Sequence, residues 1–192
     1  MSEITTYTGK LFDPTNPNID GIDIVDIAHA LSLLCRGNGH VKHFYSVGQH
    51  SISCYREAKA RNYSKKVQLA CLFHDGSEAY LSDITRPVKP KLPEYLIIED
   101  KLQNIIWQKF IKEPLSEKDL KQVFAIDDDI LSYEFEHLMP KQISDNYKNL
   151  LTKPDLSFIN PALVKKEFLD IVEKELKRSE ERRVGKECRS RW

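Results

Sequence analysis

Residues 74–89 read HDGSEAYLSDITRPVK. The stretch begins with the pair His74-Asp75 at the end of an apolar segment with helical spacing, and Glu78 follows three residues after Asp75. Imidazole nitrogen and carboxylate oxygen are ligands that Zn²⁺, Mn²⁺ and Co²⁺ accept. If the helical spacing continues, Glu78 lies on the same side as Asp75, close to such an ion without binding it, as a general acid or base would. The pair alone is weak evidence, because a polar cap at a helix end has the same sequence.

Helical patterns extend on both sides of this stretch. Apolar residues recur at helical spacing from Ile24 to Cys35, and Gly37-Asn38-Gly39 ends that predicted helix. We expect further helices at residues 46–62, 98–110 and around 164–172. Another helix should run from a cap at 62–64 to residue 74, with a helical turn at 78–81 after it. One more should run from a capping box at 116–119 to residue 139.

The segments between these helices carry turn and loop signals. Three prolines make Thr85–Pro93 a loop. Residues 1–21 are rich in turn formers, with a short extended piece at Tyr7–Phe12, and no convincing strand is found in the chain. These patterns predict a single all-α domain of about six helices.

Composition excludes several classes of protein. The chain has 192 residues, 41% of them apolar and 9% aromatic, which suits one globular domain and argues against a disordered chain. Lys+Arg and Asp+Glu are 29 each, without the positive excess of a nucleic-acid-binding domain. No apolar run approaches the ~18 residues of a membrane span, and the N-terminus lacks the pattern of a signal peptide. Cys35, Cys54 and Cys71 occur singly, as expected for reduced thiols in a cytoplasmic protein.

Residues 178–192, RSEERRVGKECRSRW, resemble the translation of a common sequencing-library adapter. We expect this segment to be an assembly artefact rather than native sequence, which leaves residues 1–177 as the domain. It holds six of the 29 basic and three of the 29 acidic residues, so the remainder has 23 and 26 and a net charge of −3. A genuine solvated basic tail is the alternative.

Two further features lie at a distance from the His-Asp pair. His50 precedes it within one predicted helix, and Asp127-Asp128-Asp129 follows it within another. This ordered set of His, His-Asp and Asp in a helical chain resembles the HD-domain metal-dependent phosphohydrolase superfamily. Within it, residues 74–89 are most similar to the bacterial HD-type 5′-deoxynucleotidases and their phage-associated relatives, which share H-D-x-S-E, an Asp five residues after the Glu, and P-V-K. Residues 23–51 are also similar, and the resemblance covers about residues 7–140.

The resemblance implies an HD-domain helical bundle that binds one divalent ion, Mn²⁺, Co²⁺ or Zn²⁺. Its implied ligands are His50, His74, Asp75 and one Asp of the triplet. We choose Asp127, because it follows an apolar residue as the family's ligand does, and keep Asp128 as the runner-up.

The resemblance also implies roles around the ion. Glu78 is the implied catalytic acid or base, and Asp83 lies in the nucleotide pocket, where it contacts substrate or assists proton transfer. Arg36 matches an arginine that contacts the substrate phosphate, and Lys89 is a weaker candidate for the same contact. The implied reaction is metal-assisted hydrolysis of a phosphoester.

The chain departs from the nucleotidase pattern at Gly37, where those enzymes carry a Trp after the Arg. The resemblance of residues 74–89 predicts a 5′-nucleotidase acting on (deoxy)nucleoside monophosphates, and the departure at Gly37 keeps a deoxynucleoside triphosphate triphosphohydrolase as one alternative. A non-catalytic module that binds nucleotide and metal is another, and a purely structural helical protein is a third. The expected partner is a small nucleotide substrate, with no nucleic acid and no membrane, and related proteins suggest a homodimer.

Overall fold

The structure is a computed structural model that describes residues 3–141 and 150–189, and side chains as far as residue 177. It confirms the all-α class, with seven α-helices in the described residues instead of about six. They are α1 (Ile24–Leu33), α2 (Val47–Ala60), α3 (Lys65–Leu72), α4 (Glu78–Leu81), α5 (Pro93–Ile111), α6 (Glu117–Leu138) and α7 (Pro161–Arg189). Two short 3₁₀ turns, η1 (Arg36–Gly39) and η2 (Lys89–Lys91), lie between them.

The N-terminal segment contains a small hairpin that the sequence did not predict as strands. β1 (Ile4–Thr5) pairs antiparallel with β2 (Leu11–Phe12), which lies within the expected extended piece. The turn between them closes through Gly9 N–H, which donates to Thr6 O over 3.0 Å. Phe12 is buried and packs on the ring of Tyr80 at 4.6 Å, so this hairpin is anchored to the helical body.

Serine side chains start three of the helices. The Ser116 side chain accepts from the backbone N–H of Asp119, and the Asp119 side chain accepts from the backbone N–H of Ser116, which is the expected capping box. Ser64 caps α3 as expected, and Ser46 forms a second capping box at the start of α2. α3 ends at Leu72, two residues earlier than predicted, so the His-Asp pair lies in the turn that follows the helix.

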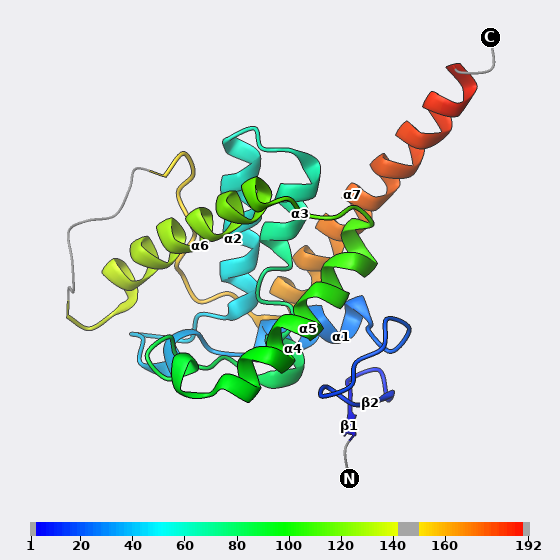
Figure 1. Cartoon of the computed structure of the whole chain (residues 1–192). Coiled ribbons are helices and arrows are strands. Elements are labelled where there is room, and N and C mark those ends of the chain that lie inside the picture. Colours follow the sequence, from blue (N-terminus) through cyan, green and yellow to red (C-terminus); the bar gives the residue numbers. More distant parts are fainter. Residues whose placement is uncertain (1–2, 142–149, 190–192) are drawn as a thin grey trace.

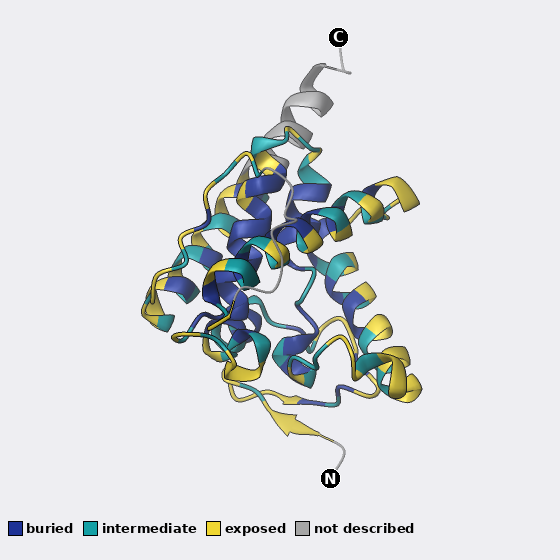
Figure 2. Cartoon of the chain, turned by 90° about the vertical axis from the view of Figure 1, so that its left-hand side faces the viewer, coloured by how far each residue is buried: buried dark blue, intermediate teal, exposed yellow. Residues whose placement is uncertain are grey.

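Helices α2 and α3 form the centre of the bundle (Figure 1). α2 packs against α1, α3, α6 and α7, and α3 also packs against α5 and α6. Figure 2 shows the buried positions gathered on the inner segments, with exposed positions on the outer helix faces. This arrangement places the end of α3 in the interior, between α5 and α6.

A cluster of three rings fixes that end of α3. Phe73 stacks on Phe110 of α5 with ring centroids 4.6 Å apart, and it contacts Phe168 of α7 edge to face at 5.6 Å. All three rings are buried. The cluster therefore holds α5 and α7 against the turn that carries the His-Asp pair.

α7 continues beyond the body of the bundle toward the C-terminus (Figure 1). Its backbone is helical to Arg189, while residues 190–192 and the side chains of the tail lie outside the described residues. The adapter origin of residues 178–192 stays a prediction.

Among the described residues, no helix combines the length and the apolar character needed to cross a membrane.

We expect Phe168→Ala to lower the free energy of unfolding by about 3–5 kcal/mol, because it leaves a cavity beside Phe73. Phe158 is the matched control, since its side chain is 60% exposed and Phe158→Ala should change stability by at most about 0.5 kcal/mol. Urea unfolding followed by circular dichroism measures both. Equal effects of the two substitutions would contradict the packing described above.

Candidate metal centre and substrate pocket

Four of the predicted ligand residues meet in the centre of the molecule. His50 of α2 and His74 of the turn after α3 place their Nε2 atoms 3.1 Å apart. Asp127 Oδ1 of α6 lies 3.1 Å from His50 Nε2 and 3.5 Å from His74 Nε2. Asp75 Oδ2 lies 3.3 Å from His74 Nε2 and 3.8 Å from His50 Nε2. We call these four residues the His-Asp cluster.

Outer hydrogen bonds decide which ring nitrogens face this cluster as acceptors. His74 Nδ1 lies 2.8 Å from the carbonyl oxygen of Cys71, which can only accept, so this nitrogen donates. His50 Nδ1 lies 2.9 Å from a carboxylate oxygen of Glu134 and donates to it. With both rings neutral, each Nε2 atom would present a lone pair to the other and to the two carboxylates. A proton on an imidazole or a bound cation would supply the positive charge that these acceptors need.

The pKa shifts of His50 and Asp127 also show that positive charge is favoured at the cluster. Burial and the charge of Arg36 lower the pKa of His50, but Cys54, Glu134 and Asp127 outweigh them, and the pKa lies well above its ordinary value. Burial raises the pKa of Asp127, but hydrogen bonds to the two imidazoles outweigh it, and the pKa lies well below its ordinary value.

The spacing of the four atoms also suits one metal ion. Ligands about 2.1 Å from an ion lie roughly 3.0–3.4 Å from each other in common geometries. Cys54 Sγ lies 3.6 Å from His50 Nε2 and forms a compact group with the two histidines. Burial raises the pKa of the Cys54 thiol to about 11 without an ion, but a coordinated metal ion would deprotonate the thiol. Cys54 is therefore a further candidate ligand beside the His-Asp cluster.

The structure separates the three members of the aspartate triplet. Asp127 faces the histidines, whereas the Asp128 side chain is 59% exposed and pairs with Arg86 at 2.7 Å. Asp129 Oδ2 accepts from Arg61 at 3.0 Å. Of the three, Asp127 is placed to bind an ion with the histidines, as the sequence interpretation chose. Its second oxygen, Oδ2, accepts from Arg86 at 2.9 Å.

A tight turn positions the His-Asp pair and Glu78. Gly76 N–H donates to Phe73 O over 2.9 Å, and the chain passes close to α5 here. A Cβ atom on Gly76 would lie 3.0 Å from Phe73 O and 3.2 Å from Ile106 Cγ2, so a larger residue would push the turn away from α5. The expectation of continued helical spacing from Asp75 to Glu78 was wrong, because α3 ends first and Glu78 begins α4.

Glu78 nevertheless lies beside the cluster as a buried acid. It is 4% exposed, and its Oε2 has no hydrogen-bond partner among the described residues. Burial raises the pKa of Glu78 well above its ordinary value, and the charges of Asp75 and Asp83 raise it further. The charges of Arg36 and Lys89 oppose this shift, but the net effect favours the protonated form of Glu78. Burial also raises the pKa of Asp83, against the lowering effect of Arg36.

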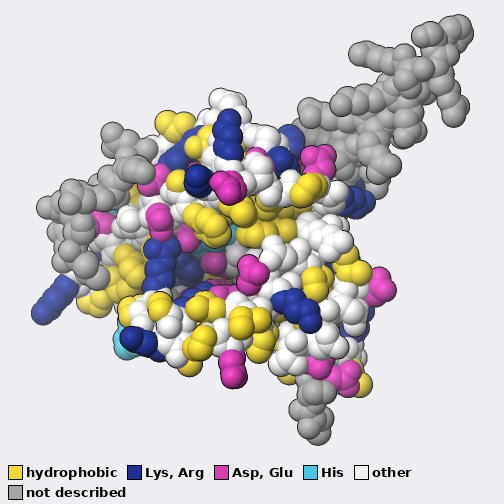
Figure 3. Space-filling view, in the orientation of Figure 1, with side chains coloured by type: hydrophobic (Ala, Val, Ile, Leu, Met, Phe, Trp, Pro, Cys, Tyr) yellow, Lys and Arg dark blue, Asp and Glu magenta, His cyan; other side chains and the backbone are white. Residues whose placement is uncertain are grey.

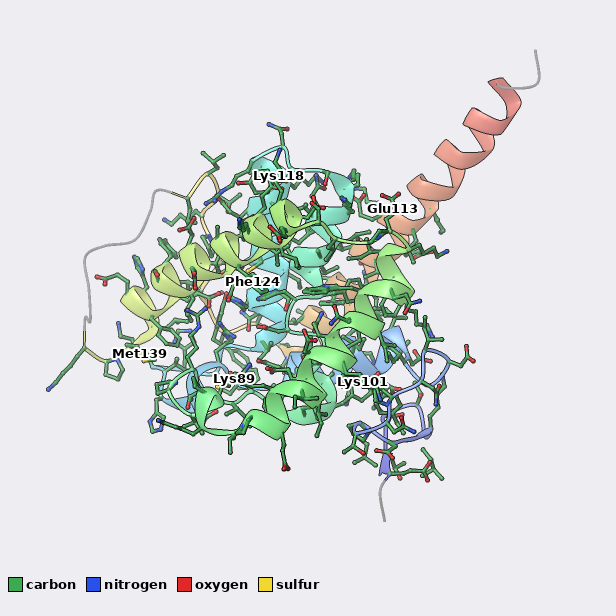
Figure 4. The ribbon with its side chains drawn as sticks, in the orientation of Figure 1. Lys89, Lys101, Glu113, Lys118, Phe124 and Met139 are labelled. Carbon is green, nitrogen blue, oxygen red and sulfur yellow. The ribbon has the colours of Figure 1, made fainter. Side chains whose placement is uncertain are left out.

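The two predicted phosphate contacts lie on either side of this acid. Arg36 is buried in η1, where its Nη1 lies 3.2 Å from Asp75 Oδ2, and its Nε has no hydrogen-bond partner among the described residues. Lys89 Nζ lies 2.7 Å from Glu99 and 3.7 Å from Glu78. Figure 4 labels Lys89, which lies in the segment before α5.

A pocket with a volume of about 450 Å³ opens above the cluster. Polar and charged side chains line it: Arg36, His40, Asp75, Glu78, Asp83, Thr85, Arg86, Lys89 and Asp127. Apolar side chains line it as well, and those of Leu131, Phe135 and Met139 follow one another along the C-terminal half of α6 and its end. Basic and acidic side chains meet apolar ones in the hollowed part of the face shown in Figure 3. The structure thus brings all of the predicted site residues to one pocket or directly beneath it.

Sequence reasoning missed Glu134. Its side chain is fully buried and accepts from Tyr45 Oη at 2.8 Å as well as from His50. A signal was present, because Glu134 interrupts a stripe of apolar residues at intervals of four along α6: Ile126, Ile130 and Leu138. A carboxylate in a buried stripe requires partners, and those partners are at the site.

Comparison with known proteins gives relatives without an assigned function. No family model matches the chain. It is 39% identical over 121 residues to the uncharacterized protein YfdR of Escherichia coli (strain K12). The matched residues cover 63% of this chain and 65% of YfdR. It is 33% identical over 109 residues to the uncharacterized protein RCAP_rcc00048 of Rhodobacter capsulatus, covering 54% and 55%. The matched part of the chain spans less than two thirds of both relatives.

Asp127→Asn and Asp128→Asn test the placement of the triplet. We expect Asp127→Asn to weaken binding of Zn²⁺ or Mn²⁺ by more than about tenfold, since changes to outer-shell groups alone cost 10–100-fold. Asp128→Asn should change it by less than about twofold, because its carboxylate points away from the histidines. Calorimetric titration of EDTA-stripped protein measures both affinities. A larger loss with Asp128→Asn would reverse the assignment.

Proposed function

We propose that this protein is a metal-dependent phosphohydrolase that cleaves the 5′-phosphoester of nucleotides, acting on (deoxy)nucleoside monophosphates. The observation that carries the proposal is the His-Asp cluster, two imidazoles and two carboxylates in mutual contact, beside a pocket that also holds a buried arginine and a buried acid. Those are the parts that metal-assisted phosphoester hydrolysis requires. The order of these residues along the chain, which resembles the HD-domain superfamily, supports the same function.

In this proposal His50, His74, Asp75 and Asp127 hold one divalent ion. Such an ion supplies Lewis-acid chemistry, lowering the pKa of water and polarising a phosphoryl oxygen. Glu134 keeps His50 in the tautomer that presents Nε2 to the ion, and the carbonyl of Cys71 does the same for His74.

The remaining polar residues act on the substrate. Arg36 binds phosphate oxygens with its guanidinium, which Asp75 holds at the edge of the cluster. Glu78 carries a proton in its buried site and donates it to the departing 5′-oxygen of the nucleoside. Lys89, paired with Glu99 and close to Glu78, keeps positive charge beside that acid and near the phosphate. Asp83, exposed to the same pocket, assists proton transfer or contacts the sugar.

A triphosphohydrolase is the second candidate, favoured by additional positive charge at the pocket. Arg86 lines the pocket, and its side chain is 60% exposed. It lies on the same segment as Lys89, so a longer phosphate chain would meet both side chains. Monophosphate hydrolysis and release of intact triphosphate cleave the same bond, between phosphorus and the nucleoside 5′-oxygen.

Product analysis separates these activities. Purified protein is incubated with deoxynucleoside mono- and triphosphates in Mn²⁺, Co²⁺, Zn²⁺ or EDTA, and the products are resolved by chromatography. Orthophosphate and nucleoside from monophosphates, lost in EDTA, support the proposal. Intact triphosphate from a deoxynucleoside triphosphate supports the second candidate. Bound metal without turnover of any nucleotide would favour the non-catalytic binding module.

Glu78→Gln separates chemistry from metal binding. We expect it to lower kcat by about 10²–10⁴-fold, because the amide cannot deliver a proton, while metal affinity stays unchanged. Glu113→Gln is the control, since Glu113 is exposed and lies at the end of α5. His74→Ala should lose both metal and turnover. Full activity in Glu78→Gln would exclude the role of this acid.

Glu134→Gln tests whether Glu134 orients His50 for metal binding. We expect metal affinity to fall by about 10–100-fold, because the amide no longer fixes the tautomer of His50. Glu117→Gln, at an exposed position in the first turn of the same helix, should leave affinity unchanged. Calorimetric titration measures both. Unchanged affinity in Glu134→Gln would show that His50 is oriented without this carboxylate.

A further inference from the structure

We propose that the apolar part of the pocket binds the nucleobase of the substrate, with the ring of Phe135 as its stacking surface. The inference rests on the proposed function and specifies which part of the substrate this surface recognises. It takes purine and pyrimidine bases, because no contact with a base-specific donor or acceptor is needed for stacking.

The residues of α6 that face the pocket form one line. Asp127, Leu131, Phe135 and Met139 recur at intervals of four, and all four line the pocket. At 1.5 Å per residue, Leu131 lies about 6 Å and Phe135 about 12 Å along the helix axis from Asp127. Along this line of α6, the carboxylate of Asp127 lies at the His-Asp cluster, and the apolar side chains lie progressively farther from it.

A nucleotide has the same order of groups. If the phosphate binds at the His-Asp cluster and Arg36, the sugar follows next to Leu131 and the base lies beyond it, over Phe135. The pocket volume of about 450 Å³ is within the 300–1,000 Å³ usual for small-molecule sites. The base position is the same for mono- and triphosphate substrates, because the scissile bond is the same.

Gly37 leaves the ring of Phe135 accessible from the Arg36 side. A Cβ atom on Gly37 would lie 3.5 Å from Met139 Cε and 3.6 Å from Phe135 Cζ, so this glycine faces the same surface directly. Its φ of +55° is also in the left-handed region, which favours glycine. A larger side chain here would extend over the ring and occupy the space assigned to the base.

The segment between α4 and α5 supplies further apolar lining of the pocket through Ile84 and Pro87. Arg86, between them, pairs with Asp127 and Asp128 and thereby ties this segment to the helix that carries Phe135. A pocket with apolar groups from two elements and charged groups beside them suits a flat ring with a polar tail.

The first test compares substrates with and without a base. We expect Phe135→Ala to raise KM for deoxyadenosine 5′-monophosphate about ten- to hundredfold, the usual loss when a stacking side chain is removed, and to leave kcat/KM for 2-deoxyribose 5-phosphate unchanged. Phe124→Ala is the matched control: Phe124 is on the same helix (Figure 4), its side chain is 52% exposed, and it does not line the pocket. Circular dichroism checks folding, and Phe135→Leu, which keeps apolar volume without the flat ring, serves as a second variant with a smaller rise in KM.

The second test needs no turnover. Binding of deoxyadenosine, thymidine and free 2-deoxyribose to EDTA-treated protein is measured by nuclear magnetic resonance titration. We expect both nucleosides to bind, the purine more tightly, and both to bind more weakly to Phe135→Ala but not to Phe124→Ala.

The outcomes separate the two proposals. If nucleosides bind through Phe135 and no phosphoester is hydrolysed, the base site stands and the proposed activity fails. If nucleotides are hydrolysed and Phe135→Ala behaves as the wild type, the activity stands and the base site is wrong. The same conclusion follows if Phe135→Ala lowers kcat/KM for 2-deoxyribose 5-phosphate as much as for deoxyadenosine 5′-monophosphate. Absence of nucleoside binding to the wild-type protein would also overturn the base site.

Discussion

Two imidazole nitrogens and two carboxylates from three separate segments of the chain face one another at the centre of the bundle, and they all present lone pairs or negative charge. Electrostatics makes this arrangement unfavourable unless positive charge is present between the groups. Much of the surrounding structure serves that requirement. Arg36 lies against Asp75, Arg86 against Asp127, and the pKa of His50 is raised. A divalent ion would satisfy all four groups at once.

The helices that meet at this point are held by apolar contacts that do not involve the site. Phe73, Phe110 and Phe168 join the end of α3 to α5 and α7, and Gly76 allows the following turn to approach α5 closely. This packing holds the turn that carries His74 and Asp75 against α5 and α7. Glu78 follows this turn and is buried by the same packing, and its burial raises its pKa. The packing of the turn therefore also sets the acidity of Glu78.

The sequence predicted most of the helices because apolar spacing and serine caps are local signals, and α1, α2, α5, α6 and α7 follow them. The choice of Asp127 within the triplet came from the resemblance to the HD-domain superfamily, and in the structure this residue lies beside both histidines. The sequence could not predict the end of α3 at Leu72, since the apolar pattern runs on and the break depends on contact with α5. Glu134 was missed because its role depends on His50, 84 residues away in the chain.

Asp127 joins the candidate metal site to the segment that carries Ile84 and Pro87. Its Oδ1 faces the histidines and its Oδ2 accepts from Arg86 on that segment. Arg86 also pairs with Asp128, whose side chain is 59% exposed. A cation bound at the cluster would compete with Arg86 for the charge of Asp127, whereas the pair to Asp128 would remain and keep the segment on α6.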